Sequence, residues 1–431
     1  MTSLKAENHL LYERVQHLEK RYDELEERTS KKIQELIDEN ENLAEANRLL
    51  LEEKQKPTET TSCVSLQQIP DELLLPGNGI QTKLISCISD AHEFGNLLCV
   101  STLKSQPQIA ITGGVDKNIY AHNWDTKESK FCKFEGSAPV LSVSFNPNPE
   151  FASYFVASFM DAKHGLFQLK NSLEDRQEDW EIQCVTMFHE HLRQGALRVA
   201  WNASGDHFAT GSCDKSLHIY RCENLKSRSE KSFKESEASE LCVKIKSFYF
   251  NGTVEAILFL PTRNEAGVFE EKELLLAAVR DDCYLHYIDM ETLEKERINM
   301  NQDGIEHSSY TIMDLQLAPS RKYCLAATDK NRLFIFQPQS NFLLRNFYGH
   351  KAGAYSQPRA AWHPSEKYIV ANSEDSGSLY VWCVASESVV DIVDAHEKIV
   401  RDLTVQNDAQ GAFLYTVSYD RSMKVWSYDS S

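Results

Sequence analysis

One pattern recurs seven times between residues 82 and 428 and limits what the chain can fold into. Each copy is an apolar run, a small residue, an aspartate in a short turn and a second alternating run, as in HFATGSCDKSLHIYRC at 207–222 and FLYTVSYDRSMKVWSY at 413–428. Two alternating runs joined by a short turn are typical of a β-hairpin. Repeated units of this length stack so that each covers its neighbour. The turn aspartates are Asp116, Asp161, Asp214, Asp281, Asp329, Asp375 and Asp420.

The spacing of these aspartates predicts an all-β ring. Five of the six spacings lie between 45 and 53 residues. The sixth, from Asp214 to Asp281, is 67 and contains two polar stretches, 223–240 and 262–272. Further strand-like runs, such as VLSVSFNP before a hairpin and VDIVDAH after one, give four strands per unit. Seven such units predict a seven-bladed β-propeller. The Ser-, Lys- and Glu-rich stretch 223–240 is expected to be disordered, and whether its serines are phosphorylated is left open.

The repeat resembles the WD40 family of β-propellers over about residues 82–428. In that family a structural tetrad joins a His before the first strand, a Ser or Thr ending the second, the turn Asp and a third-strand Trp. By this resemblance two copies of the repeat carry a complete tetrad. A third copy keeps His189 or His191, Ser212 and Asp214, with Tyr220 in place of Trp. Four copies are degenerate, with Gly114, Phe159, Val279 and Ala327 at the serine position. The two complete sets are His350, Ser373, Asp375 and Trp382, and His396, Ser418, Asp420 and Trp426.

The His, Ser and Asp residues are interpreted as structural. A Ser-His-Asp set suggests a hydrolase, but in a repeat its hydrogen bonds satisfy groups that would otherwise be buried unpaired. The HEH at 189–191 suggests a metal site, but no Cys or further His accompanies it. No GxxxxGK[ST], GxSxG, HExxH or kinase motif occurs. We therefore expect a protein that is not an enzyme and has no cofactor and no metal.

The seventh repeat lacks a fourth strand, and an extra strand precedes the first. The stretch TKLISCISDAH at 82–92 has the composition of a fourth strand and ends in the same Asp-Ala-His as 394–396. We expect residues 82–90 to pair with 422–428 and close the ring.

Residues 1–53 carry a leucine stripe typical of a coiled coil. Leucines recur every seven residues, with an interval of eleven between Leu25 and Leu36 that indicates a stutter. Buried asparagines, and Arg14 placed to face Glu19 of a partner helix, favour a parallel homodimer, and a heterodimer with a related coil stays open. Residues 54–81 are interpreted as a linker, because Pro57 ends the helix and PGNG at 76–79 excludes the F-box that IPDELLL resembles. The predicted dimerisation residues are Leu4, Asn8, Leu11, Val15, Leu18, Tyr22, Leu25, Leu36, Asn40, Leu43, Asn47 and Leu50.

Charge and cysteine usage indicate a cytoplasmic protein, with the nucleus as the other compartment. The formal net charge of −18 does not favour nucleic acid or an anionic membrane as a partner. Eleven scattered cysteines without a CxxC pair indicate reduced thiols. No apolar run is long enough to span a membrane, and the N-terminus does not have the apolar core of a secretory signal.

These features predict a scaffold that binds protein partners and is dimerised by its coiled coil. The alternative is a substrate receptor of a ubiquitin ligase, although NWDTK at 123–127 has Lys where the W-D-x-R docking signature has Arg. The WD40 resemblance implies that the turn-Asp and loop-His segments share the narrower top face, and Arg and Tyr are common interface anchors. The expected partner-binding residues are Lys117, His191, Arg193, Lys215, Arg280, Tyr310, Lys330, Tyr355, Glu374, Tyr419 and Arg421.

Overall fold

A computed structural model describes residues 14–18, 20–22, 31, 69–126, 128–174, 177–192, 197–223, 225, 241–263, 269–353, 356–408 and 411–430. The chain divides into two units, Met1–Leu66 and Gln67–Ser431. In the first unit, residues 14–18, 20–22 and 31 are helical. The other residues of the predicted coil lie outside the described residues, including Leu4, Asn8, Leu11, Leu25, Leu36, Asn40, Leu43, Asn47 and Leu50.

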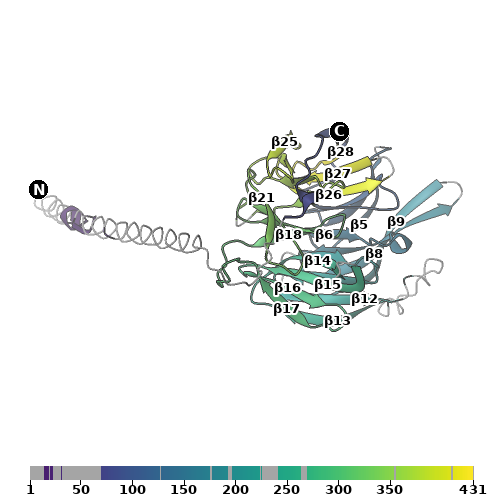
Figure 1. The fold of residues 1–431 in the computed structure, drawn as a ribbon. Helices are drawn as coiled ribbons and strands as arrows, with labels where there is room; N and C mark the ends of the chain where they lie inside the picture. Colours follow the sequence, from purple (N-terminus) through teal and green to yellow (C-terminus); the bar gives the residue numbers. More distant parts are fainter. Residues whose placement is uncertain are drawn as a thin grey trace, which may run out of the picture. The chain divides into compact units, whose positions relative to one another are not determined.

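The described part of the second unit forms seven four-stranded antiparallel sheets arranged as the blades of a propeller (Figure 1). Blade 1 is β2 (Leu97–Thr102), β3 (Ile109–Gly114), β4 (Asn118–Asn123) and β5 (Glu128–Glu135). Blade 2 is β6 (Val140–Phe145), β7 (Tyr154–Phe159), β8 (His164–Glu174) and β9 (Gln177–Phe188). Blade 3 is β10 (Leu197–Trp201), β11 (His207–Ser212), β12 (Ser216–Cys222) and β13 (Cys242–Tyr249). Blade 4 is β14 (Val254–Arg263), β15 (Phe269–Val279), β16 (Tyr284–Asp289) and β17 (Lys295–Asn299).

The remaining blades complete the ring, and the predicted all-β seven-bladed fold is confirmed. Blade 5 is β18 (Ile312–Leu317), β19 (Cys324–Thr328), β20 (Leu333–Phe336) and β21 (Leu343–Phe347). Blade 6 is β22 (Ala360–Trp362), β23 (Tyr368–Asn372), β24 (Ser378–Cys383) and β25 (Val389–Asp394). Blade 7 is β26 (Val400–Asp408), β27 (Gly411–Ser418), β28 (Met423–Ser430) and β1 (Ile80–Ile88). The described residues also include the short 3₁₀ helices η1 (Asp71–Leu73) and η2 (Pro149–Phe151).

The hydrophobic core lies between neighbouring blades. Each inner strand contacts the next one around the ring, and β26 of blade 7 contacts β2 of blade 1. Phe155 and Phe167 of blade 2 pack with Ile111 and Val140 between blades 1 and 2. Because each sheet is covered on both faces, its second strand is buried along almost its whole length, as in β3 and β7.

Blade 7 joins two segments that are distant in the sequence. β1 pairs with β28 antiparallel, with Leu84 opposite Trp426 and a shift in register between Leu84 and Ser86. The strand pairing expected from the extra strand before the first repeat is present, although β1 covers 80–88 instead of 82–90. This pairing gives the outer edge of β28 a hydrogen-bonded neighbour.

The segment just before β1 packs against the propeller, although it was predicted to be part of a linker. Leu73 is buried in the core between blades 5 and 6. Its carbonyl accepts a hydrogen bond from Arg345 Nη2 at 3.3 Å, and Glu72 accepts hydrogen bonds from Lys322 Nζ and the Tyr323 hydroxyl. Gly77 lies so close to Tyr368 that a Cβ would fall 2.0 Å from its hydroxyl oxygen. Residues 69–79 therefore form a strap across blades 5 and 6.

Candidate functional site

One end of the propeller collects the turns between second and third strands and the loops that lead into the inner strands. We call this end the turn face. His92 Nδ1 lies 2.7 Å from Asp116 Oδ1, His191 Nδ1 lies 3.1 Å from Asp214 Oδ2, and His396 Nδ1 lies 3.0 Å from Asp420 Oδ2. These contacts join the two kinds of loop in blades 1, 3 and 7.

The hydroxyl of the blade 7 tetrad belongs to Thr416 and not to Ser418 as predicted. Thr416 Oγ1 lies 2.8 Å from His396 Nε2 and accepts the indole N–H of Trp426 at 3.0 Å. Ser418 instead donates to the carbonyl oxygen of Lys398 at 2.9 Å. Thr416 lies two residues earlier on the same face of β27, which places its hydroxyl beside the third strand. Burial raises the pKa of Asp420, but hydrogen bonds from His396 and Ser422 outweigh it, so this pKa stays below its usual range.

The residue at the position of Thr416 in each blade decides whether that blade has the hydrogen-bond network of the tetrad. Thr112 in blade 1 lies 2.9 Å from His92 Nε2 and 2.7 Å from His122 Nε2. Thr210 in blade 3 lies 2.9 Å from His191 Nε2, so His191 and not His189 is the tetrad histidine. The strand registers place alanine at this position in the other four blades, namely Ala157, Ala277, Ala326 and Ala371.

Blade 6 was therefore wrongly predicted to be complete, and blade 1 wrongly predicted to be degenerate. Ser373 donates to Asp375 at 2.6 Å and the indole of Trp382 donates to the Tyr348 carbonyl at 2.8 Å. Among the described residues, neither ring nitrogen of His350 has a hydrogen-bond partner, and the ring packs edge-to-face on Trp382. Burial lowers the pKa of His350 to about 4.

Blade 5 differs from the predicted alignment by one residue. Its hairpin has the same length as those of blades 1, 2, 3 and 7, which places Thr328 at the serine position and Lys330 at the turn-Asp position. Asp329 instead accepts the backbone N–H of Thr311 at 2.8 Å. Ala327 and Asp329 were each predicted one position too early.

The predicted partner-binding residues differ in how available they are. Lys117, Lys215, Lys330 and Arg421 are exposed on the turn face, and Arg421 pairs with Asp90 at 2.9 Å. Tyr419 is half-buried, and its backbone N–H donates to the Ile399 carbonyl at 3.2 Å. His191 is buried in its tetrad. Arg193 and Tyr355 lie outside the described residues.

Three of the predicted partner-binding residues are held by the propeller itself. Arg280 Nε pairs with the buried carboxylate of Glu255 at 2.7 Å. Tyr310 packs edge-to-face on Phe334. Glu374 accepts the backbone N–H of Gly353 at 2.7 Å. These contacts make Arg280, Tyr310 and Glu374 weaker candidates for partner binding than the exposed lysines.

Sequence reasoning missed an apolar group on the turn face. Phe94 and Leu192, in the loops that lead into the inner strands of blades 1 and 3, are 75% and 91% exposed. Val115 and Met160, in the hairpin turns of blades 1 and 2, are also exposed. The loop that carries Phe94 reaches Val115, since a Cβ on Gly95 would lie 3.0 Å from Val115 Cβ. We call these four residues the apolar arc. The available signal was an apolar residue directly before a turn aspartate in two successive repeats.

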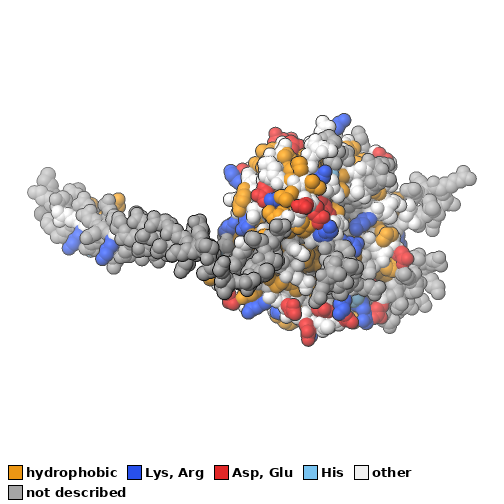
Figure 2. Space-filling model, viewed as in Figure 1, with side chains coloured by type: hydrophobic (Ala, Val, Ile, Leu, Met, Phe, Trp, Pro, Cys, Tyr) orange, Lys and Arg blue, Asp and Glu red, His pale blue; other side chains and the backbone are white. Residues whose placement is uncertain are grey.

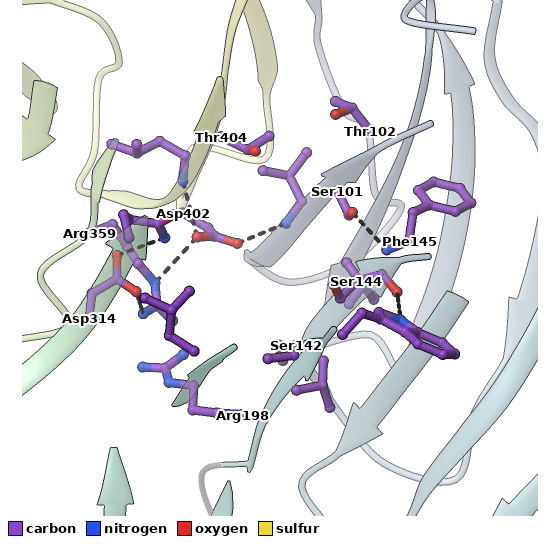
Figure 3. A pocket seen from close by; sticks show the side chains of 18 of the residues that line it. Ser101, Thr102, Ser142, Ser144, Phe145, Arg198, Asp314, Arg359, Asp402 and Thr404 are labelled. Atoms are coloured by element: carbon purple, nitrogen blue, oxygen red, sulfur yellow. Dashed lines mark hydrogen bonds and ion pairs between the residues drawn. The ribbon is translucent and has the colours of Figure 1, made fainter. Parts of the chain in front are cut away.

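The inner strands surround a cavity of about 730 Å³ (Figure 3). Arg359 lies in it between two carboxylates, 3.2 Å from Asp314 and 3.3 Å from Asp402. These carboxylates also accept backbone N–H groups of the next blade, from Ala360 and Val100 respectively. Burial raises the pKa of Asp314 to about 7 and that of Asp402 to about 6. The charged groups bind one another and the strand edges, so this cluster joins neighbouring blades.

Among the residues that the structure describes, no group of three or more His, Cys, Asp or Glu side chains is placed to hold a metal ion. In the same residues, no helix has both the length and the apolar character needed to cross a membrane. Figure 2 shows acidic, basic and apolar side chains interspersed over the visible side of the propeller.

The ring of seven blades and the His–Thr–Asp networks define a WD40-repeat propeller, and this chain contains WD40 repeats. The family model described as WD domain, G-beta repeat matches residues 182–221 and 387–427. These ranges hold the tetrads of blades 3 and 7.

The particular relatives match only small parts of the chain. It is 31% identical to pre-mRNA-processing factor 19 of Bos taurus over 134 residues, which is 30% of this chain and 25% of that protein. The Mus musculus protein of the same name is 30% identical over the same shares. The periodic tryptophan protein 2 homolog of Dictyostelium discoideum is 38% identical over 64 residues, 15% of this chain and 7% of that protein. The chain thus spans a quarter or less of the length of these relatives.

Proposed function

We propose that this chain is a non-enzymatic scaffold that binds protein partners on the turn face of its propeller. The observation that carries this proposal is the apolar arc, because its four exposed apolar side chains lie in loops of three successive blades at one end of the propeller, and exposed apolar surface is typical of interaction sites. A WD40 propeller supports the coarser statement that the chain takes part in protein interactions.

The residues beside the arc indicate the chemistry of the partner. Lys117 and Lys215 follow the turn aspartates of blades 1 and 3 with positive φ, 71° and 68°, and both side chains are exposed. The preceding aspartates are paired with histidines of the propeller, Asp116 with His92 and Asp214 with His191. The partner that fits this surface is a segment with apolar side chains flanked by acidic ones, since an interface favours opposite charges at its rim.

A second part of the proposal is a homodimer through residues 1–53. In the helical residues 14–18 and 20–22, the side chains of Val15, Leu18 and Tyr22 are 50%, 58% and 68% exposed. These are three of the predicted dimerisation residues, and such an apolar stripe is covered when a second helix packs on it. Two propellers on one dimer would bind repeated targets with a gain in avidity.

The relatives support one of the two expected compartments. Pre-mRNA-processing factor 19 is named for a nuclear process, so we propose that this chain acts in the nucleus. The ubiquitin-ligase receptor alternative gains no supporting contact from the described residues.

Affinity purification of the full chain with a charged substitution in the arc tests the binding surface. The variant Phe94→Asp with Leu192→Asp should lose the partners that the unmodified chain retains. The matched control is Ile392→Asp, on the outer strand of blade 6, where Ile392 is also exposed. Thermal unfolding of each variant confirms that the propeller is folded. Equal partner recovery by the arc variant and the control would contradict the proposed surface.

A further inference from the structure

A pair of cysteines lies at the end of blade 3 that is opposite the turn face. Cys222 is the last residue of β12 and Cys242 is the first residue of β13. The two residues are directly opposite in the antiparallel register, and their Sγ atoms lie 2.7 Å apart. Both side chains are buried with Trp201 and Phe151 in the core between blades 2 and 3.

This position suits a disulfide. Opposed residues of an antiparallel pair have Cα atoms about 4.5–5.5 Å apart, and a disulfide requires roughly 4.4–6.8 Å. The two sulfur atoms are closer than two unbonded thiols normally approach. No change of the sheet is therefore needed to join them.

We propose that Cys222 and Cys242 form a reversible disulfide, with a hydroperoxide as the oxidant. One thiolate attacks the peroxide oxygen, which breaks the O–O bond, releases water or an alcohol and leaves a sulfenic acid. The second sulfur attacks the sulfenic sulfur, the S–S bond forms and water leaves with the remaining proton. The pair loses two electrons and two protons, and the peroxide takes up both.

The bond would fix the two ends of the polar insertion. Cys222 and Cys242 are 20 positions apart and flank the stretch 223–240, so the disulfide turns this stretch into a covalent loop. The hydrogen bond with Cys242, and then burial, raise the pKa of the Cys222 thiol. Because the thiolate is the reactive form, we expect the pair to be oxidised more slowly than the exposed Cys87.

Peptide mapping of the folded full chain tests the proposal. The chain is treated with hydrogen peroxide, its remaining thiols are alkylated under denaturing conditions, and it is digested with trypsin without reduction. Cleavage after Arg221, Lys226, Lys234 and Lys244 gives peptides 222–226 and 235–244. The expected product is these two peptides joined and lighter by two hydrogen atoms, and dithiothreitol should separate them.

Variants distinguish this bond from general oxidation. Cys222→Ser and Cys242→Ser should each abolish the joined peptide, whereas Cys324→Ser, at a buried thiol of blade 5, should leave it unchanged. The proposal is wrong if both thiols of the folded chain remain fully alkylated when peroxide treatment is continued well beyond the time at which Cys87 is completely oxidised. A joined peptide that appears only when the chain is unfolded before oxidation would also overturn it, and this outcome needs no variant to fold.

Discussion

Single hydroxyl groups decide which blades of this propeller have a complete hydrogen-bond network. Thr112, Thr210 and Thr416 each contact a buried histidine, and alanine replaces them in blades 2, 4, 5 and 6. The tetrad in this chain is therefore a property of three blades. The buried histidine of each of these blades bonds the threonine hydroxyl through one ring nitrogen and the turn aspartate through the other, which is the arrangement expected of a structural role.

Removing the hydroxyl of Thr416 should destabilise the propeller more than removing that of Ser418. Thr416→Val keeps the shape but leaves His396 and the Trp426 indole without their partner in a buried site, which costs about 1–3 kcal/mol. Ser418→Ala removes the partner of the Lys398 carbonyl and of the Asp420 backbone N–H, both in part-buried positions near the turn, and should cost about 1 kcal/mol or less. Urea unfolding of the two variants measures the difference. Equal losses would mean that Ser418 is as much a part of the network as Thr416.

Buried histidines should make the propeller sensitive to mild acid. Burial lowers the pKa of His350 and of His218 to about 4, and that of His164 well below its ordinary value. In the unfolded chain the histidine pKa values are about 6.5. Between pH 6.5 and 4 the unfolded chain therefore binds more protons than the folded chain. The free energy of unfolding thus falls as pH falls through this window. His350 alone should lower the free energy of unfolding by at most about 2 kcal/mol at pH 5.

Denaturation midpoints at pH 7.5 and pH 5 measure the effect, and His350→Phe should make the pH dependence of stability shallower. An unchanged slope in this variant would show that His350 does not titrate as expected.

At the scale of elements, the strap 69–79 contributes to the core without belonging to any sheet. Leu73→Ala should cost about 2–5 kcal/mol, because Leu73 is buried between blades 5 and 6. Leu75 of the same segment is exposed and serves as the matched control, for which a change within about 0.5 kcal/mol is expected. Chemical denaturation of both variants checks this. Similar effects would mean that the strap does not stabilise the propeller.

The hairpins were predictable from sequence because alternation and turn residues are local signals. The third-strand positions of Trp382 and Trp426 were correctly placed for the same reason. The register of blade 5 was missed because Asp329 and Lys330 are adjacent and either one fits a turn. The threonine position was missed because Thr416 and Ser418 both carry a hydroxyl on the same face of one strand and differ only by two residues along it.

Features that depend on several blades could not be predicted from any one segment. Arg359 contacts Asp314 and Asp402 only because the ring brings blades 5, 6 and 7 around one channel. The apolar arc is made of loop residues, and loops have no periodicity that reveals which side chains are exposed together. The closing strand was predictable because a missing fourth strand and an extra first strand are visible in the repeat count.

At the scale of the whole molecule, the predicted homodimer would double the number of turn faces. Light scattering of the full chain should give twice the mass of one chain, because the leucine stripe of residues 1–53 needs a second helix to cover it. Leu18→Glu with Leu25→Glu places charges at two positions of the leucine stripe and should give monomers. Lys20→Glu, at an outward position of the same heptads, is the control and should remain dimeric.

The loss of the dimer should also weaken binding to repeated targets. The affinity for a surface that carries many copies of the partner should fall by about ten-fold or more, because avidity is lost. The affinity for a single partner molecule in solution should be unchanged, because the contacts of each propeller remain. A monomeric unmodified chain, or equal loss against both targets, would contradict a role for the coil in joining two propellers.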